Sequence, residues 1–104
     1  MQFTRSDNFT GSHAWDALDI ATVEGASVRL HWADKAYRWH VNDGEEVFVV
    51  LTGRVNMHYR DAQGAEHVRA MMAGDICHAG AGDAHVAHPD GVARILVIEK
   101  PGSV

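Results

Sequence analysis

Apolar and polar residues along this chain form short stretches, and each stretch ends at a glycine-containing turn. The segments between the turns are rich in β-branched and aromatic residues, and none is long enough to predict a helix. Short strands at such spacing are typical of sandwiches and barrels, so the pattern predicts an all-β fold. The turns are Glu24-Gly25, Asp43-Gly44, Thr52-Gly53, residues 61–64, Ala73-Gly74, residues 80–82 and Asp90-Gly91.

One predicted strand stands out because it carries no polar residue over its central part. Residues 47–51 read VFVVL. An entirely apolar run predicts burial on both faces, as in the inner strand of a closed or double-layered sheet. The predicted strands are residues 19–23, 27–32, 37–41, 45–51, 54–60, 66–71, 75–78, 85–88 and 92–99.

Length and charge narrow the class of protein. A chain of 104 residues fits a single domain, residues 1–104, built on one core. The formal net charge is −5, and the basic residues are scattered, which argues against a nucleic-acid partner. No apolar run approaches the length of a membrane span, and the first residues lack the apolar region of a signal peptide. We therefore expect a cytoplasmic protein with no membrane partner.

The cysteine and histidine counts direct attention to metal chemistry. Cys77 is the only cysteine, so no intramolecular disulfide can form. The chain also contains eight histidines. Stability must then come from packing, with a metal or a partner subunit as further sources.

Three polar residues surround the Asp43-Gly44 turn. His40 and Asn42 are two apart and share a face of the predicted strand. Glu46 is the polar end of an otherwise apolar stripe on the next strand. If the turn joins these strands in a hairpin, the three side chains lie within reach of each other. About forty residues later, GDICHAGAGDAHVAHP places three histidines around a glycine-rich turn: His78, His85 and His88.

These two segments resemble the paired motifs of the cupin superfamily. In the first, residues 34–53, His40 and Asn42 stand at the two His-x-His positions, Glu46 follows after three residues, and Gly53 after six more. In the second, residues 74–89, Gly74 is followed by the glycine turn of residues 80–82 and by His85. The resemblance implies a double-stranded β-helix, also described as a jelly-roll barrel.

The chain departs from the cupin pattern at several positions. Asp34 replaces a glycine, Gly80 replaces a proline and Pro89 replaces an asparagine, whereas Asn42 replaces a histidine that ordinarily binds metal. The resemblance implies that a divalent ion binds His40, Glu46 and His85. Asn42 is either an additional oxygen ligand or a turn residue. Two histidines and one carboxylate suit Fe, and the same donors suit Mn, Ni or Zn.

Two classes of function are compatible with this set of residues. The first is a metal-dependent enzyme, such as an oxygenase or isomerase, acting on a small organic molecule inside the barrel. The second is a non-catalytic module that binds or senses a small molecule in the same cavity. Under either reading, the small size and apolar outer strands of such barrels predict a homodimer.

Overall fold

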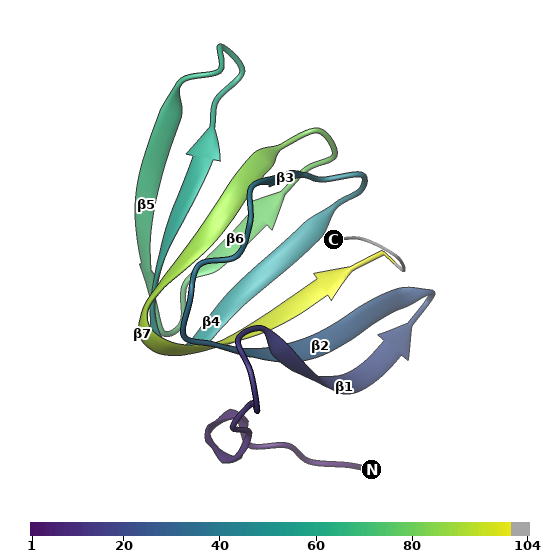
Figure 1. Ribbon diagram of the computed structural model, residues 1–104. Helices are drawn as coiled ribbons and strands as arrows, with labels where there is room; N and C mark the ends of the chain where they lie inside the picture. Colours follow the sequence, from purple (N-terminus) through teal and green to yellow (C-terminus); the bar gives the residue numbers. More distant parts are fainter. Residues whose placement is uncertain (101–104) are drawn as a thin grey trace.

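The computed structural model describes residues 1–100, which form one bent antiparallel sheet of seven strands (Figure 1). A single turn of 3-10 helix, η1, precedes the sheet. No helix within residues 1–100 has the length and apolar character needed to cross a bilayer. The elements are η1 (Ser6–Asn8), β1 (Asp16–Val23), β2 (Ala26–Ala33), β3 (His40–Val41), β4 (Glu46–Arg60), β5 (Glu66–Met72), β6 (Ile76–Ala79) and β7 (Ala84–Glu99).

Two long strands, β4 and β7, hold the sheet together. They pair with each other over most of their length, and the sheet order is β1-β2-β7-β4-β5. The first part of β7 also pairs with β3, and its last part pairs with β2. Similarly, β6 pairs with the start of β4 and β5 with its end. Because β1 and β5 do not pair with each other, the sheet is strongly curved but not closed.

Both long strands pass through positions that were expected to be turns. Thr52-Gly53 lies inside β4, where the register with β7 shifts on both sides of Thr52. Asp90-Gly91 lies inside β7 in the same way. Gly53 and Gly91 have positive φ angles of 80° and 74°, so these glycines bend continuous strands instead of ending them. The prediction of separate strands at 45–51 and 54–60, and at 85–88 and 92–99, was wrong for this reason.

The core lies on the concave face of the bent sheet. Phe48 and Val50 are buried before the bend in β4, and Val55 and Met57 are buried after it. Buried positions therefore change from even to odd numbers across Gly53, as expected when a bulge adds one residue to a strand. Strand β7 completes the core with Ala87, Ala93, Ile95 and Val97.

The run VFVVL is buried on only one of its faces within this chain. Phe48 and Val50 are buried, whereas Val47 and Val49 are half-buried and Leu51 is exposed. The expectation of burial on both faces was therefore wrong for the isolated chain. The outward side chains of β4 form part of an apolar convex face.

The other predicted strands are present with shifted ends, and the largest shift concerns residues 37–41. Only His40–Val41 are in strand conformation there. The shortened strand still matters, because it places His40 against β7.

Candidate metal centre

Strand pairing between β3 and β7 brings the two motif histidines together. His40 is directly opposite His85 in the antiparallel register. Their rings meet edge to face, with centroids 4.3 Å apart. Because directly opposed residues share a face of the sheet, both imidazoles project to the concave side.

The hairpin expected between His40 and Glu46 does not form. The backbone of residue 42 pairs elsewhere: Asn42 N–H donates to Asp83 O at 2.9 Å, and Gly82 N–H donates to Asn42 O at 2.8 Å. Strand β4 instead begins between β6 and the end of β7, with Glu46 opposite Ala79 and Glu99. The glutamate still reaches the histidines, but from a neighbouring part of the curved sheet.

Three donor atoms converge at this place. Glu46 Oε1 lies 3.4 Å from His85 Nε2 and 3.9 Å from His40 Nε2. One donor atom from each of the three residues lies within 4.8 Å of the other two. Glu46 and His85 are only 5% and 3% exposed. A glutamate and two imidazoles therefore face one another away from solvent.

None of these three converging atoms has a hydrogen-bond partner among the described residues. His40 Nε2, Glu46 Oε1 and His85 Nε2 are all buried and unpaired. Such atoms are rare in native structures, because an unpaired buried polar atom costs about 1–3 kcal/mol. A cation bound between them would satisfy all three at once, so these side chains fit a metal ion.

The orientation of His40 also suits a ligand. Its Nδ1–H donates to the Arg38 carbonyl at 3.2 Å, and the Tyr37 ring packs edge-on against the imidazole. A proton on Nδ1 leaves the lone pair on Nε2, as is usual for metal-binding histidines. Burial lowers the pKa of His40 and of His85. Both imidazoles are therefore biased toward the neutral form that binds metals.

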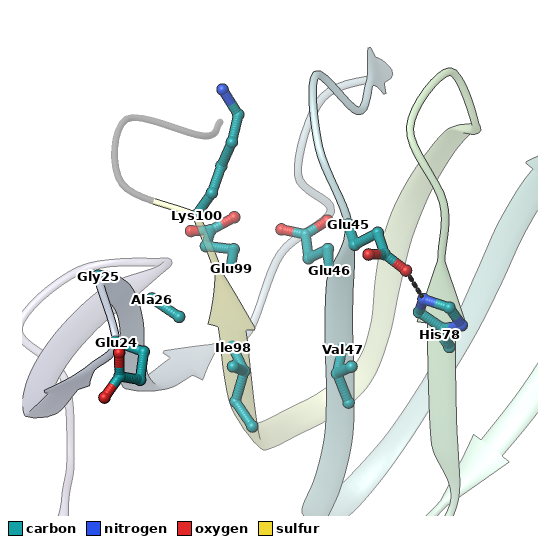
Figure 2. Close-up of a pocket in the computed structure, with 10 residues that line it drawn as sticks. All are labelled: Glu24, Gly25, Ala26, Glu45, Glu46, Val47, His78, Ile98, Glu99 and Lys100. Atoms are coloured by element: carbon teal, nitrogen blue, oxygen red, sulfur yellow. Dashed lines mark hydrogen bonds and ion pairs between the residues drawn. The ribbon is translucent and has the colours of Figure 1, made fainter.

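Motif reasoning missed Glu99, a carboxylate directly opposite Glu46. Its side chain and that of Glu46 point toward one another between β4 and β7 (Figure 2). Burial, followed by the hydrogen bond to Glu46, raises the pKa of Glu99 to about 8. Burial also raises the pKa of Glu46. The sequence contained one signal for Glu99, because it ends an apolar stripe of alternate residues just as Glu46 begins one.

Asn42 lies beside the three donors, although its role as a ligand stays a prediction. It is 6% exposed, so the structure buries it as it does the proposed ligands. Its amide approaches Glu46 closely enough to lower the pKa of that carboxyl, but Nδ2 reaches no hydrogen-bond geometry with a described residue.

The other two histidines of the second motif lie away from this cluster. His78 is exposed, and its Nε2 lies 2.9 Å from Glu45 Oε1 on the rim (Figure 2). His88 packs its ring against His58, with centroids 4.1 Å apart.

A cavity of about 750 Å³ opens beside His85 on the concave side of the sheet. Its wall combines apolar side chains with tyrosine, arginine and aspartate. A volume of this size admits a small organic molecule next to His85, the one proposed ligand that lines it. Side chains that line it include Met57, Tyr59, Arg69, Met71, Cys77, Asp83 and His85.

Comparison with solved structures assigns the architecture. A cupin-2 domain protein from Shewanella frigidimarina superposes with a TM-score of 0.76 at 23% identity, over 86% of this chain and 84% of that one. A cupin superfamily protein from Desulfitobacterium hafniense also gives 0.76, at 12% identity, over 91% and 85% of the two chains. The chain has the cupin fold. The two neighbours are small cupins of similar length, and the all-β jelly-roll prediction is confirmed.

The cupin fold also occurs in a metal-containing enzyme among the neighbours. Hydroquinone 1,2-dioxygenase in complex with Fe3+ superposes with a TM-score of 0.77 at 18% identity, over 88% of this chain. The matched part is 29% of the dioxygenase chain. No protein-family model matches this sequence, and no curated protein matches it. These identities define the fold and leave the chemistry to be argued from the site.

Proposed function

We propose that this cupin binds one divalent first-row transition ion through His40, Glu46 and His85 and acts as a metal-dependent oxygenase on a small organic molecule. The observation that carries the proposal is the convergence of three buried, unpaired donor atoms. Two imidazoles and one carboxylate are the donor set of non-haem Fe(II) oxygenases, which keep coordination positions open for substrate and dioxygen. Iron is therefore the preferred ion, and Mn, Ni and Zn are the other candidates.

The cavity beside His85 is the proposed binding site for the organic molecule. Its apolar wall, with Met57 and Met71, would exclude water from the reacting molecule, and Tyr59 and Arg69 provide polar contacts. Bound iron would supply the activation of dioxygen, while these side chains would hold the substrate near it. An Fe3+-containing dioxygenase shares this fold, so the fold accommodates the proposed chemistry.

Metal content tests the first half of the proposal. Metal-free protein is loaded separately with Fe2+ under anaerobic conditions, Mn2+, Ni2+ or Zn2+, and elemental analysis gives ions per chain. We expect one ion in the wild-type protein and loss of most of it in His40→Ala and His85→Ala. His78→Ala is the matched control, because that imidazole is exposed and contacts Glu45. Full occupancy in both ligand variants would show that the assignment is wrong.

Dioxygen uptake tests the second half. Iron-loaded protein is mixed with hydroquinone, catechol or small carboxylic acids in an oxygen electrode, with metal-free protein as the blank. Metal-dependent uptake with one of these compounds is the expected result. If a compound raises the melting temperature and is recovered unchanged, the protein is a binding or sensor module. Conversion without dioxygen uptake would identify an isomerase.

We also propose that the protein is a homodimer formed through its convex face. The register aligns apolar residues across five neighbouring strands; Leu30, within this row, is already buried by the chain itself, whereas the other four are exposed or half-buried. Of these residues, Leu18 is 38% exposed and Ile76 is 68% exposed. The exposed and half-buried members of this row favour a second copy as their cover. The row consists of Leu18, Leu30, Leu96, Val49 and Ile76. The cytoplasmic location stays a prediction.

A further inference from the structure

The Glu46–Glu99 pair has more acceptor capacity than the protein satisfies. The two carboxyls are directly opposite in the β4–β7 register, so their side chains share one face of the sheet. Figure 2 shows both at the ends of their strands, pointing toward one another. Glu46 Oε1 and Glu99 Oε2 are nevertheless buried and without a hydrogen-bond partner among residues 1–100.

The cationic side chains near this pair are engaged elsewhere. Arg29 Nε contacts Asp19 Oδ1 at 2.8 Å. Lys100 Nζ lies 3.4 Å from Asp43 Oδ2 and extends away from the carboxyls in Figure 2. Among residues 1–100, neither of these cationic side chains forms an ion pair with Glu46 or Glu99, although buried carboxylates are normally paired or bound to metal.

Two independent observations indicate where the missing cation would bind. The side chains of Glu46 and His85 are 6% and 4% exposed, and each directs an unpaired atom toward the same point. Glu99 lies directly opposite Glu46, so its side chain projects from the same concave face of the sheet as the two imidazoles. The pair therefore belongs to the environment of the proposed metal centre.

We propose that Glu99 is the fourth protein ligand of that centre, in place of the histidine that Asn42 replaces. This inference rests on the proposed metal-binding function. Glu99 lies outside the three-residue cluster whose donor atoms are within 4.8 Å of one another, so its carboxylate would reach an ion held by Glu46 after its side chain rotates toward that residue. Glu99 supplies a charged oxygen, whereas Asn42 offers only a neutral amide oxygen.

The additional carboxylate changes which metals the site prefers. Two imidazoles and two carboxylates would balance the charge of a divalent ion. Oxygen-rich sites of this kind suit Mn2+ and Fe2+ better than sites dominated by imidazole do. The ligand class is therefore a divalent cation with a preference for oxygen donors.

The test uses Mn2+ alone as the probe. Metal-free protein is titrated while the EPR signal of free Mn2+ is followed, for the wild type, Glu99→Gln, Asn42→Ala and Glu45→Gln. We expect Glu99→Gln to weaken binding at least tenfold and Asn42→Ala to weaken it less. Glu45→Gln should bind like the wild type, because Glu45 is exposed and contacts His78. Equal affinity of Glu99→Gln and the wild type would overturn the inference.

A second measurement separates a ligand from a residue that only positions Glu46. Loss of a bound oxygen should change the energy and intensity of the visible Co2+ bands, whereas loss of an outer hydrogen bond should lower affinity and leave the bands unchanged. Weaker binding with an unchanged Co2+ spectrum would overturn the assignment. Glu99→Asp keeps the charge and should retain a wild-type-like spectrum with weaker binding. It also serves as the test variant if circular dichroism shows that Glu99→Gln is unfolded.

The same titrations distinguish failure of the metal centre from failure of Glu99 as its fourth ligand. If the wild-type protein binds none of Mn2+, Fe2+, Ni2+ and Zn2+, both are wrong. If the wild type binds Mn2+ and His85→Ala does not, the metal centre is correct. In that case, a Glu99→Gln protein with wild-type affinity refutes only the fourth ligand.

Discussion

At the residue scale, the burial of Glu46 and Glu99 lowers the folding stability of the metal-free protein. Burial raises the pKa of both carboxyls, which means that the fold disfavours their charged forms. Their directly opposed positions in the β4–β7 register allow one proton to lie between them. A bound cation would remove the need for that proton, so the same residues favour folding at low pH and metal binding at higher pH.

This cost predicts how Glu99→Gln changes the pH dependence of stability in metal-free protein. Folding raises the pKa of Glu99 from 4.5 to about 8, so between these values the folded state holds a proton that the unfolded state lacks. The contribution of Glu99 to stability therefore falls as pH rises through this window. Glutamine does not titrate, so the variant should become progressively more stable relative to the wild type from pH 5 to pH 8.

Urea unfolding in the presence of a chelator at pH 5, 6, 7 and 8 measures this difference. The lowered pKa values of His40 and His85 give an opposite slope below pH 6.5; both proteins contain these histidines, so the comparison at pH 7 and 8 is the one that isolates Glu99. Glu99 is only half-buried, so screening by solvent reduces the size of the effect. A difference that stays constant with pH would contradict the prediction.

The three proposed ligands could be predicted from the sequence, whereas the position of Glu99 beside Glu46 could not. His40, Glu46 and His85 lie in recognisable motif spacings, and the structure brings them together even though the expected hairpin is absent. Glu99 lies far from Glu46 along the chain, and only the antiparallel register of β4 and β7 makes them neighbours. Register between distant strands depends on how the whole sheet packs, which local spacing does not reveal.

At the element scale, the bends in β4 and β7 determine the shape of the cavity. Gly53 has a φ of +80°, and a Cβ atom built on it would lie 2.2 Å from the Val92 carbonyl oxygen. The close approach of backbone to backbone needs a residue without a side chain. Gly53 therefore serves two requirements at one position: a left-handed conformation and space for the neighbouring strand.

Comparison of Gly53→Ala with Gly64→Ala separates these two requirements. Gly64 has a nearly identical φ of +82°, but nothing lies within 4 Å of a Cβ built there. Gly64→Ala should cost about 1–2 kcal/mol from the left-handed conformation alone. Gly53→Ala should cost this plus about 1–3 kcal/mol from overpacking against β7. Chemical denaturation measures both, and equal losses would show that the close approach relaxes freely.

The strands themselves were predictable to different degrees. Alternation and β-branched content located most of them, because such residues favour a pleated, half-buried surface. Thr52-Gly53 and Asp90-Gly91 were misinterpreted because a glycine with positive φ has the same local sequence in a turn and in a bulge. Only the pairing of β4 with β7 on both sides of the bend distinguishes the two.

At the scale of the whole molecule, the two faces of the curved sheet differ. The concave face holds the core, whereas the convex face is only partly covered by the rest of the chain. The N-terminal segment lies against part of the convex face, where Arg94 Nε donates to the Phe9 carbonyl at 2.8 Å. Beyond this segment, Val47, Val49 and Ile98 remain only half-buried. An entirely apolar strand such as VFVVL is difficult to explain in a monomer, whereas a dimer gives its outer side chains a partner.

This reasoning predicts a dimer that a single charge can separate. In a two-fold symmetric interface each residue occurs twice, so Ile76→Lys places two ammonium groups against an apolar surface. Ile76 is 68% exposed in the single chain, so the change should cost little folding stability. Val68→Lys is the matched control, because Val68 is 57% exposed on β5, which is not part of the apolar row. We expect light scattering to give twice the 11.4 kDa chain mass for the wild type and Val68→Lys, and the single-chain mass for Ile76→Lys. A monomeric wild-type protein at concentrations of tens of micromolar would mean that VFVVL is apolar for a reason other than self-association.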